Sequence, residues 1–223
     1  MNYSMIKTLI LKDWHFQRTA ILLAFAGGAV SFGIVFTGTQ AGFTIGLILL
    51  VTVMVMISAM TVMGNVLGER ENQTLAFAMT LPISYLEYTT SKIVGNLLLF
   101  IPFWLTMLAG SLTLIVLTPA IHGFFAFAII MAVEILLSTC LMLVVALVTE
   151  SKAWSITAMV TGNLALNVVG YLVAHLPGIK EGLFGTQIYW TPTATITLSI
   201  EFALIALLIG GAFHIQSRKQ DFI

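Results

Sequence analysis

Two glutamates are the residues best placed to carry chemistry, because Glu134 and Glu201 are each the only charged residue in a long apolar stretch. An ionised carboxylate near the middle of a membrane-spanning helix costs about 2.5 to 3.5 kcal/mol on insertion scales, so Glu134 must face protein or water. It is either a substrate or gating residue, or a protonated or hydrogen-bonded packing group with Ser138 one turn away as a neighbour. Both interpretations stay open.

Two further pairs of residues each share a helical face at a spacing of four. Asn163 and Asn167 form a narrow polar stripe, which suits hydrogen bonds between helices and also suits the lining of a path through the membrane. Met56 and Met60 form a soft, polarisable stripe, which is typical of core packing and also suits contact with varied apolar molecules. Together with the two glutamates, these four residues are the candidates for lining such a path.

Catalytic and metal-binding motifs are absent from the sequence. It has no GxxxxGK[ST] phosphate loop, no HExxH, no GxSxG and no Cys/His pair at metal spacing. We therefore expect that the chain hydrolyses no ATP by itself and binds no cofactor or metal. The single cysteine, Cys140, excludes an intramolecular disulfide. Zero net charge argues against nucleic acid as a partner, because nucleic-acid binding needs a basic surface.

The elements that must position these residues are membrane-spanning helices. Of the 223 residues, 59% are hydrophobic and only 8% are Asp, Glu, Lys or Arg, against roughly 45 to 50% and about 25% in soluble domains. A hydrocarbon core needs about 20 helical residues, and we predict six such spans. Gly27, Gly28 and Gly33 in the first span indicate close contact with another helix. The expected spans are residues 19–36, 42–67, 93–117, 122–149, 153–174 and 194–213.

Residues 1–18 are predicted to form a separate amphipathic helix. Trp14 lies with other apolar residues on one half of the circumference and basic and polar residues fill the other half, although Leu11 and Asp13 break the pattern. Such a helix lies flat in the headgroup region of a bilayer, and the alternative is a cytosolic helix packed on another protein. The segment is not a cleavable signal peptide, because lysines and Arg18 interrupt any apolar run.

The basic residues predict the orientation. Eight of the nine lie in the N-terminal segment, the second-to-third connection, the fourth-to-fifth connection or the C-terminal tail, and only Lys180 lies on the opposite side. Cytoplasmic connections carry the excess of Lys and Arg. The sequence therefore predicts an all-α polytopic membrane protein with both termini in the cytoplasm. Residues 19–223 would form its six-helix transmembrane domain, with residues 68–92 as a cytoplasmic segment.

The connection between the second and third spans holds the densest cluster of polar residues. Charged residues come first, a short amphipathic helix follows, and a Leu-Pro-Ile-Ser stop precedes a Ser-Lys pair; the run extends from Glu69 to Ser84 and then to Ser91 and Lys92. An ordinary loop is one interpretation. In order and spacing, however, these residues resemble the first cytoplasmic loop of ABC-2 type transporter permeases. The N-terminal amphipathic helix, the six spans, an aromatic outer loop and a short basic tail are similar to that family as well.

The resemblance implies a subunit that forms a membrane pathway and takes its energy from a separate ATP-binding cassette ATPase. In that family two permeases pair with two ATPases, so the implied partners are an ATPase that binds ATP and Mg and a second permease copy, identical or similar. The resemblance also implies export of hydrophobic or amphipathic small molecules or peptides across the plasma membrane of a prokaryote. The residues that would meet the ATPase are Glu69, Arg70, Glu71, Asn72, Thr74 and Leu75.

Other classes of function compete with this one. A self-contained secondary transporter or channel would use Glu134 as a proton or ion site and need no ATPase. A haem-exporter-like permease of similar length is an alternative within the family, although the charged loop and the tail look more like those of drug and peptide exporters. An intramembrane enzyme is disfavoured, because no nucleophile and base occur at a suitable spacing.

Overall fold

The computed structural model describes residues 3–68, 85–183 and 185–218, and these residues form helices joined by short connections. No strand occurs among them. Glu69 to Leu75, the residues expected to contact an ATPase, lie outside the described residues. The elements in order are α1 (Tyr3–Val35), α2 (Gln40–Val62), the π-helix η1 (Met63–Leu67), α5 (Tyr85–Leu117), the 3-10 helix η2 (Pro119–Ile121), α6 (Phe124–Thr149), α7 (Lys152–His175), α8 (Ile179–Gly182) and α9 (Pro192–Ser217).

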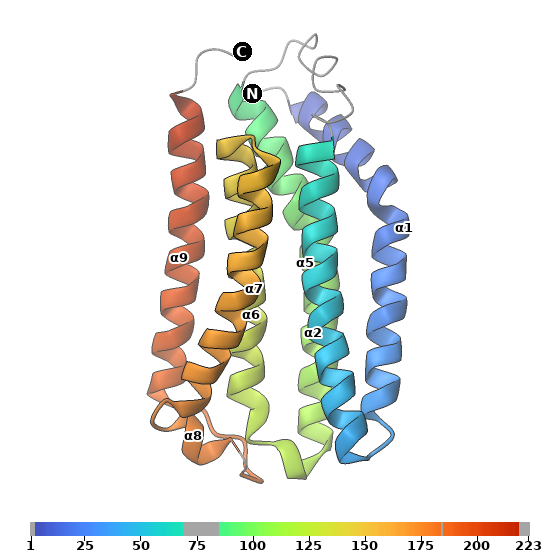
Figure 1. The fold of residues 1–223 in the computed structure, drawn as a ribbon, viewed down its shortest axis with the longest axis vertical. Helices are drawn as coiled ribbons and strands as arrows, with labels where there is room; N and C mark the ends of the chain where they lie inside the picture. Colours follow the sequence, from blue (N-terminus) through green and yellow to red (C-terminus); the bar gives the residue numbers. More distant parts are fainter. Residues whose placement is uncertain (1–2, 69–84, 184, 219–223) are drawn as a thin grey trace.

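The six expected spans are confirmed as helices. Six described helices are long and apolar enough to cross a membrane: α1, α2 with η1, α5, α6, α7 and α9. They stand side by side as one bundle, in which the start of α1 and the end of α9 lie at the same end (Figure 1). We call this the terminal end and the opposite one, which carries α8, the distal end. Which end faces the cytoplasm stays a prediction from the basic residues.

In the structure the N-terminal segment and the first span belong to one helix. A single helix, α1, passes through Arg18 without a break, because neither proline nor glycine occurs near that position. Its 33 residues measure about 50 Å, against a hydrocarbon core of about 30 Å, so roughly its first four turns extend beyond the core. Asp13 and Gln17 lie on the buried face of these turns, whereas Trp14 and Phe16 are exposed.

The last residues of the segment 68–92 are helical in the structure. Helix α5 begins at Tyr85, so the residues from there to Lys92 are its first two turns rather than part of a connection. No proline or glycine interrupts the sequence between Tyr85 and Lys92, so nothing prevents these residues from joining the helix. Lys92 is fully buried, and its ammonium group packs against α1.

The core of the bundle lies around α5 and α6. Phe100 and Phe103 of α5 are completely buried in its largest apolar cluster, which also takes side chains from α1, α2, α6 and α7. Helices α1 and α2 approach closely at the distal end, where a Cβ at Gly46 would lie 2.8 Å from the backbone oxygen of Ser31. Gly33, expected at a close helix contact, has open space beside it instead.

Candidate functional site

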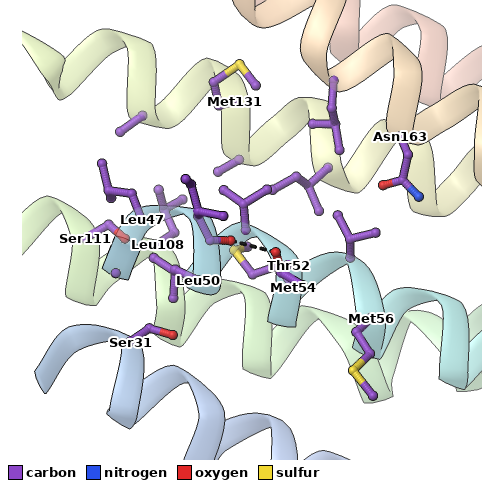
Figure 2. A pocket seen from close by; sticks show the side chains of 18 of the residues that line it. Ser31, Leu47, Leu50, Thr52, Met54, Met56, Leu108, Ser111, Met131 and Asn163 are labelled. Carbon is purple, nitrogen blue, oxygen red and sulfur yellow. Dashed lines mark hydrogen bonds between the residues drawn. The ribbon is translucent and has the colours of Figure 1, made fainter. Parts of the chain in front are cut away.

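A groove of about 1170 Å³ runs along α2, and parts of α1, α5, α6 and α7 complete its walls (Figure 2). Its lining follows α2 from Phe43 at the distal end to Met63 and Gly64 on η1. At 1.5 Å per residue this distance is about 31 Å, close to the thickness of a hydrocarbon core. The groove is therefore long enough to reach across a membrane, and its volume slightly exceeds the 300 to 1,000 Å³ range typical of ligand pockets.

The groove is lined by flexible methionine side chains and by no charged residue. No Asp, Glu, Lys or Arg lines it. Its hydroxyl groups are already satisfied within their own helices, because Ser31 donates to the carbonyl of Gly27 at 2.8 Å and Thr52 to that of Ile48 at 2.7 Å. Asn163 extends from α7 towards α2 (Figure 2). The methionines that line the groove are Met54, Met56, Met60, Met63, Met131 and Met159.

Four of the six residues predicted to line a path come together in this groove. Met56 and Met60 enter it from α2, and Asn163 and Asn167 from α7. The hydrogen bond of Asn167 differs from the expected contact between helices, since its amide donates to the carbonyl of Asn163 on the same helix at 2.9 Å. The Asn167 amide therefore forms its hydrogen bond within α7 and not with another helix.

Glu134 and Glu201 lie elsewhere, between α6 and α9. Their residues are 5% and 4% exposed, and the two carboxyl groups interact electrostatically. Neither oxygen of Glu201 has a hydrogen-bond partner. Ser138, the expected neighbour of Glu134, faces α7 instead, where it packs against the backbone of Gly162. The structure therefore separates the two glutamates from the groove and places them at similar depths on α6 and α9, two helices packed against each other.

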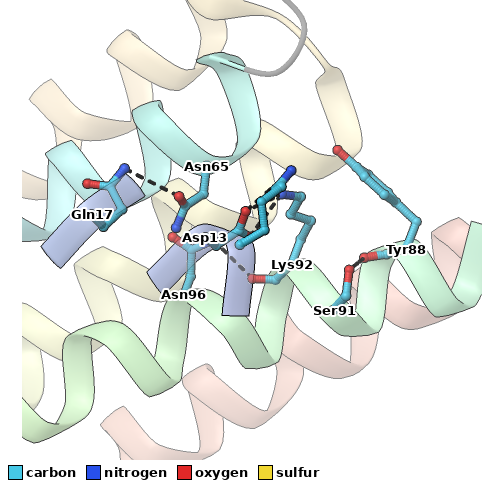
Figure 3. Close-up of polar contacts among 8 residues, drawn as sticks. Asp13, Gln17, Asn65, Tyr88, Ser91, Lys92 and Asn96 are labelled. Atoms are coloured by element: carbon cyan, nitrogen blue, oxygen red, sulfur yellow. Dashed lines mark hydrogen bonds and ion pairs between the residues drawn. The ribbon is translucent and has the colours of Figure 1, made fainter. Parts of the chain in front are cut away.

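A buried polar cluster occupies the terminal end of the bundle (Figure 3). Lys92 of α5 donates to both carboxylate oxygens of Asp13 on α1, at 3.0 and 3.3 Å, with side chains 0% and 4% exposed. Asn96 donates to the carbonyl of Lys92 at 2.9 Å. Gln17 of α1 donates to Asn65 of η1 at 3.3 Å. Three helices that are distant in sequence thus meet through charged and amide groups.

The cluster and the groove share Gln17. This side chain lines the terminal end of the groove and packs so closely over η1 that a Cβ at Gly64 would collide with its amide. A π-helix such as η1 is rare and frequently marks a functional position in a longer helix. Sequence reasoning missed this cluster, and its one signal was Asp13, the charged residue that broke the apolar stripe of the N-terminal segment.

No protein-family model, curated protein or solved structure matches this chain. In the described part of the chain, no group of three or more His, Cys, Asp or Glu side chains is arranged to hold a metal ion.

Proposed function

We propose that this chain is the membrane-spanning permease subunit of an ATP-driven transporter, with the groove along α2 as its share of the translocation pathway. The observation that carries the proposal is the groove itself, which is as long as a hydrocarbon core is thick and is lined by methionines and no charged residue. The six spans and the resemblance of the 68–92 segment to ABC-2 type permeases support it. A prokaryotic plasma membrane, with both termini in the cytoplasm, is part of the proposal.

The cargo that suits this groove is a hydrophobic or amphipathic small molecule or peptide. An ion left in such a groove would lose its hydration without meeting an opposite charge, which is costly in an apolar environment. Methionine side chains adapt to different apolar shapes, which favours varied cargo over one tightly fitted ligand. Export as the direction of transport rests on the family resemblance.

The energy for transport would come from a separate ATPase that binds the segment beginning at Glu69. This segment follows directly on η1, whose Asn65 binds Gln17 at the end of the groove. At its other end the chain enters α5, whose Lys92 binds Asp13 of α1. A displacement of the segment would therefore reach the groove through one helix and α1 through the other. A second copy of the chain, or a similar permease, would complete the pathway.

The groove is tested by filling it with larger side chains. Met56→Trp and Met60→Trp are each expected to lower transport of apolar substrates about tenfold, because overfilling a site costs roughly 1 to 3 kcal/mol. Both methionines are exposed within the groove, at 57% and 42%, so the changes should leave the fold intact. The matched control is Leu105→Trp, at a side chain that is 51% exposed on α5 and outside the groove.

The readout is efflux of a fluorescent apolar dye from proteoliposomes that contain the chain, its ATPase and ATP. Equal transport by the Met56, Met60 and Leu105 variants would show that the groove is not part of the translocation pathway.

A self-contained secondary transporter or channel is the second candidate, and the buried pair of Glu134 and Glu201 favours it. The two candidates differ in what drives transport. Proteoliposomes that contain the chain alone should transport nothing under the first proposal, and should transport in response to a proton or ion gradient under the second. If no ATPase co-purifies with the unmodified chain and a gradient alone drives transport, the second candidate replaces the first.

A further inference from the structure

Glu134 and Glu201 are the two acidic residues that stand deep within the spans. Helices α6 and α9 both start at the distal end and run in the same direction, with α9 at the edge of the bundle (Figure 1). Glu134 lies ten residues after Phe124, and Glu201 lies nine residues after Pro192, at depths of about 15 and 14 Å along their helices. Both carboxyl groups are therefore near the middle of a hydrocarbon core about 30 Å thick.

The surroundings offer these carboxyl groups no compensation for negative charge. Glu201 is 4% exposed and receives no hydrogen bond on either oxygen. Helix α2, which packs on α6, has no titratable side chain. On the other helices packed against the pair, the charged and histidine side chains lie towards the helix ends: Glu87 and Lys92 on α5, Lys152 and His175 on α7, and His214 on α9.

Two ionised carboxylates cannot persist together in such a place. Each loses its hydration without gaining a partner, and each repels the other in a medium of low dielectric constant. Interacting carboxyl pairs in proteins solve this problem by holding a proton between them. A divalent metal ion fits less well, because such ions are held by several ligands, and among the described residues no group of three or more His, Cys, Asp or Glu side chains could hold one.

We propose that Glu134 and Glu201 form one proton-binding site, which keeps at least one proton at neutral pH and holds α9 against α6. Losing this proton places a second negative charge at the contact and so weakens the attachment of α9. Proton binding at this contact is a property of the chain itself and requires neither the groove nor an ATPase. It would persist if the proposed permease function were wrong.

Infrared spectroscopy of the purified full chain in nanodiscs tests the site directly, since a protonated carboxyl group absorbs apart from a carboxylate and shifts in D₂O. At pH 7 the wild type should show the protonated band, and the double variant Glu134→Gln, Glu201→Gln should lose it. The control Glu181→Gln, at an exposed residue of α8, should keep it. Absence of the band in the wild type, or an unchanged band in the double variant, would overturn the proposal.

Single variants show whether the two carboxyl groups act as one site. With Glu134→Gln or Glu201→Gln the remaining carboxyl no longer faces a second charge, so the pH at which its band is half lost should change by about one unit or more. Two independent packing carboxyls would each keep their own titration. Replacing K⁺ by Na⁺ at constant ionic strength should leave the wild-type band unchanged, and a loss of the band in Na⁺ would mean that a metal cation occupies the site.

The pH dependence of thermal stability gives a second measurement on the same samples. Above about pH 5 an unfolded glutamate has lost its proton, whereas the folded pair keeps one, so the folded state binds more protons and its stability should fall as pH rises. The apparent Tm of the wild type should therefore fall from pH 6 to pH 9 relative to that of the double variant, whose amides do not ionise. Parallel Tm curves for the two proteins would contradict the proposal.

Discussion

Asp13 shows how much a single charged residue can reveal when it breaks a pattern. It spoils an otherwise apolar helical stripe, and the sequence offers no explanation for it. In the structure it is buried on α1 and receives two hydrogen bonds from the ammonium group of Lys92. That ammonium also lies 5.7 Å from the ring centroid of Tyr88, within the range of a cation–π contact. The pair joins α1 to α5 towards the terminal end of the bundle.

Breaking this ion pair on one side should destabilise the protein more than replacing both of its members. Lys92→Met removes the buried ammonium that donates to both oxygens of Asp13 and leaves the partly exposed Lys12, 3.6 Å from the carboxylate, so we expect a loss of up to about 3 to 5 kcal/mol. The double change Asp13→Leu, Lys92→Met removes both charges and should recover most of that loss. Denaturant unfolding of the purified chain in detergent measures the free energy of each variant.

The control for this cycle is Lys152→Met, at an exposed lysine of the same end, which should change stability by no more than about 1 kcal/mol. If the double variant is as unstable as Lys92→Met alone, the interaction between the charges of Asp13 and Lys92 contributes little to the free energy of unfolding.

The sequence predicted the residues of the groove better than it predicted their contacts. Residues four apart lie on one face of a helix, so the pairs Met56 with Met60 and Asn163 with Asn167 each entered the groove together. Periodicity within one helix cannot say which helix stands opposite. The packing of the helices that carry Glu134 and Glu201, and the ion pair of Asp13 with Lys92, involve positions 67 and 79 residues apart, which a single sequence does not reveal.

At the scale of elements, helix boundaries were the least predictable feature. Apolar runs located all six spans, but they did not reveal that α1 continues through Arg18 or that α5 already begins at Tyr85. Hydropathy measures transfer into lipid, and polar turns beyond the core are not recorded by it. Gly27 and Gly28 lie at close contacts of α1 with α2 and α5, as expected, whereas Gly33 does not, and Gly42 and Gly46 of α2 form a further small-xxx-small contact with α1.

The segment after η1 is the element on which the proposed coupling to an ATPase would depend. The double change Glu69→Ala, Glu71→Ala should leave the six spans inserted but weaken binding of the ATPase at least about 30-fold, because truncating one side of a desolvated charge pair costs about 2 to 5 kcal/mol. Leu75→Asp should have the same effect by placing an unpaired charge on the docking surface. Co-purified ATPase stoichiometry and substrate-stimulated ATP hydrolysis in nanodiscs are the two readouts.

Glu181→Ala serves as the control for these variants, because it removes a similar charge at the distal end. Normal binding and normal stimulation in both the double glutamate variant and Leu75→Asp would show that another part of the chain receives the ATPase.

For the whole molecule, the arrangement of charge predicts how the bundle sits in the membrane. The described basic residues in the half of the bundle near the terminal end are Lys7, Lys12, Arg18, Lys92, Lys152 and Arg218, whereas Lys180 stands at the distal end. Basic residues are retained on the cytoplasmic side during insertion, so the terminal end should face the cytoplasm. The proposed ATPase could reach the segment after η1 only in this orientation.

Labelling of single cysteines in intact cells tests the orientation. In a Cys140→Ala background, Ala120→Cys and Gln187→Cys place an exposed thiol at the distal end, and Ala153→Cys and Ser217→Cys place one at the terminal end. A membrane-impermeant maleimide should label the first two from outside and the last two only after the cells are permeabilised, which also proves that all four thiols are reactive. Labelling of Ser217→Cys but not Gln187→Cys in intact cells would show that the bundle has the opposite orientation in the membrane. The proposed contact with a cytoplasmic ATPase would then be impossible, whatever the groove transports.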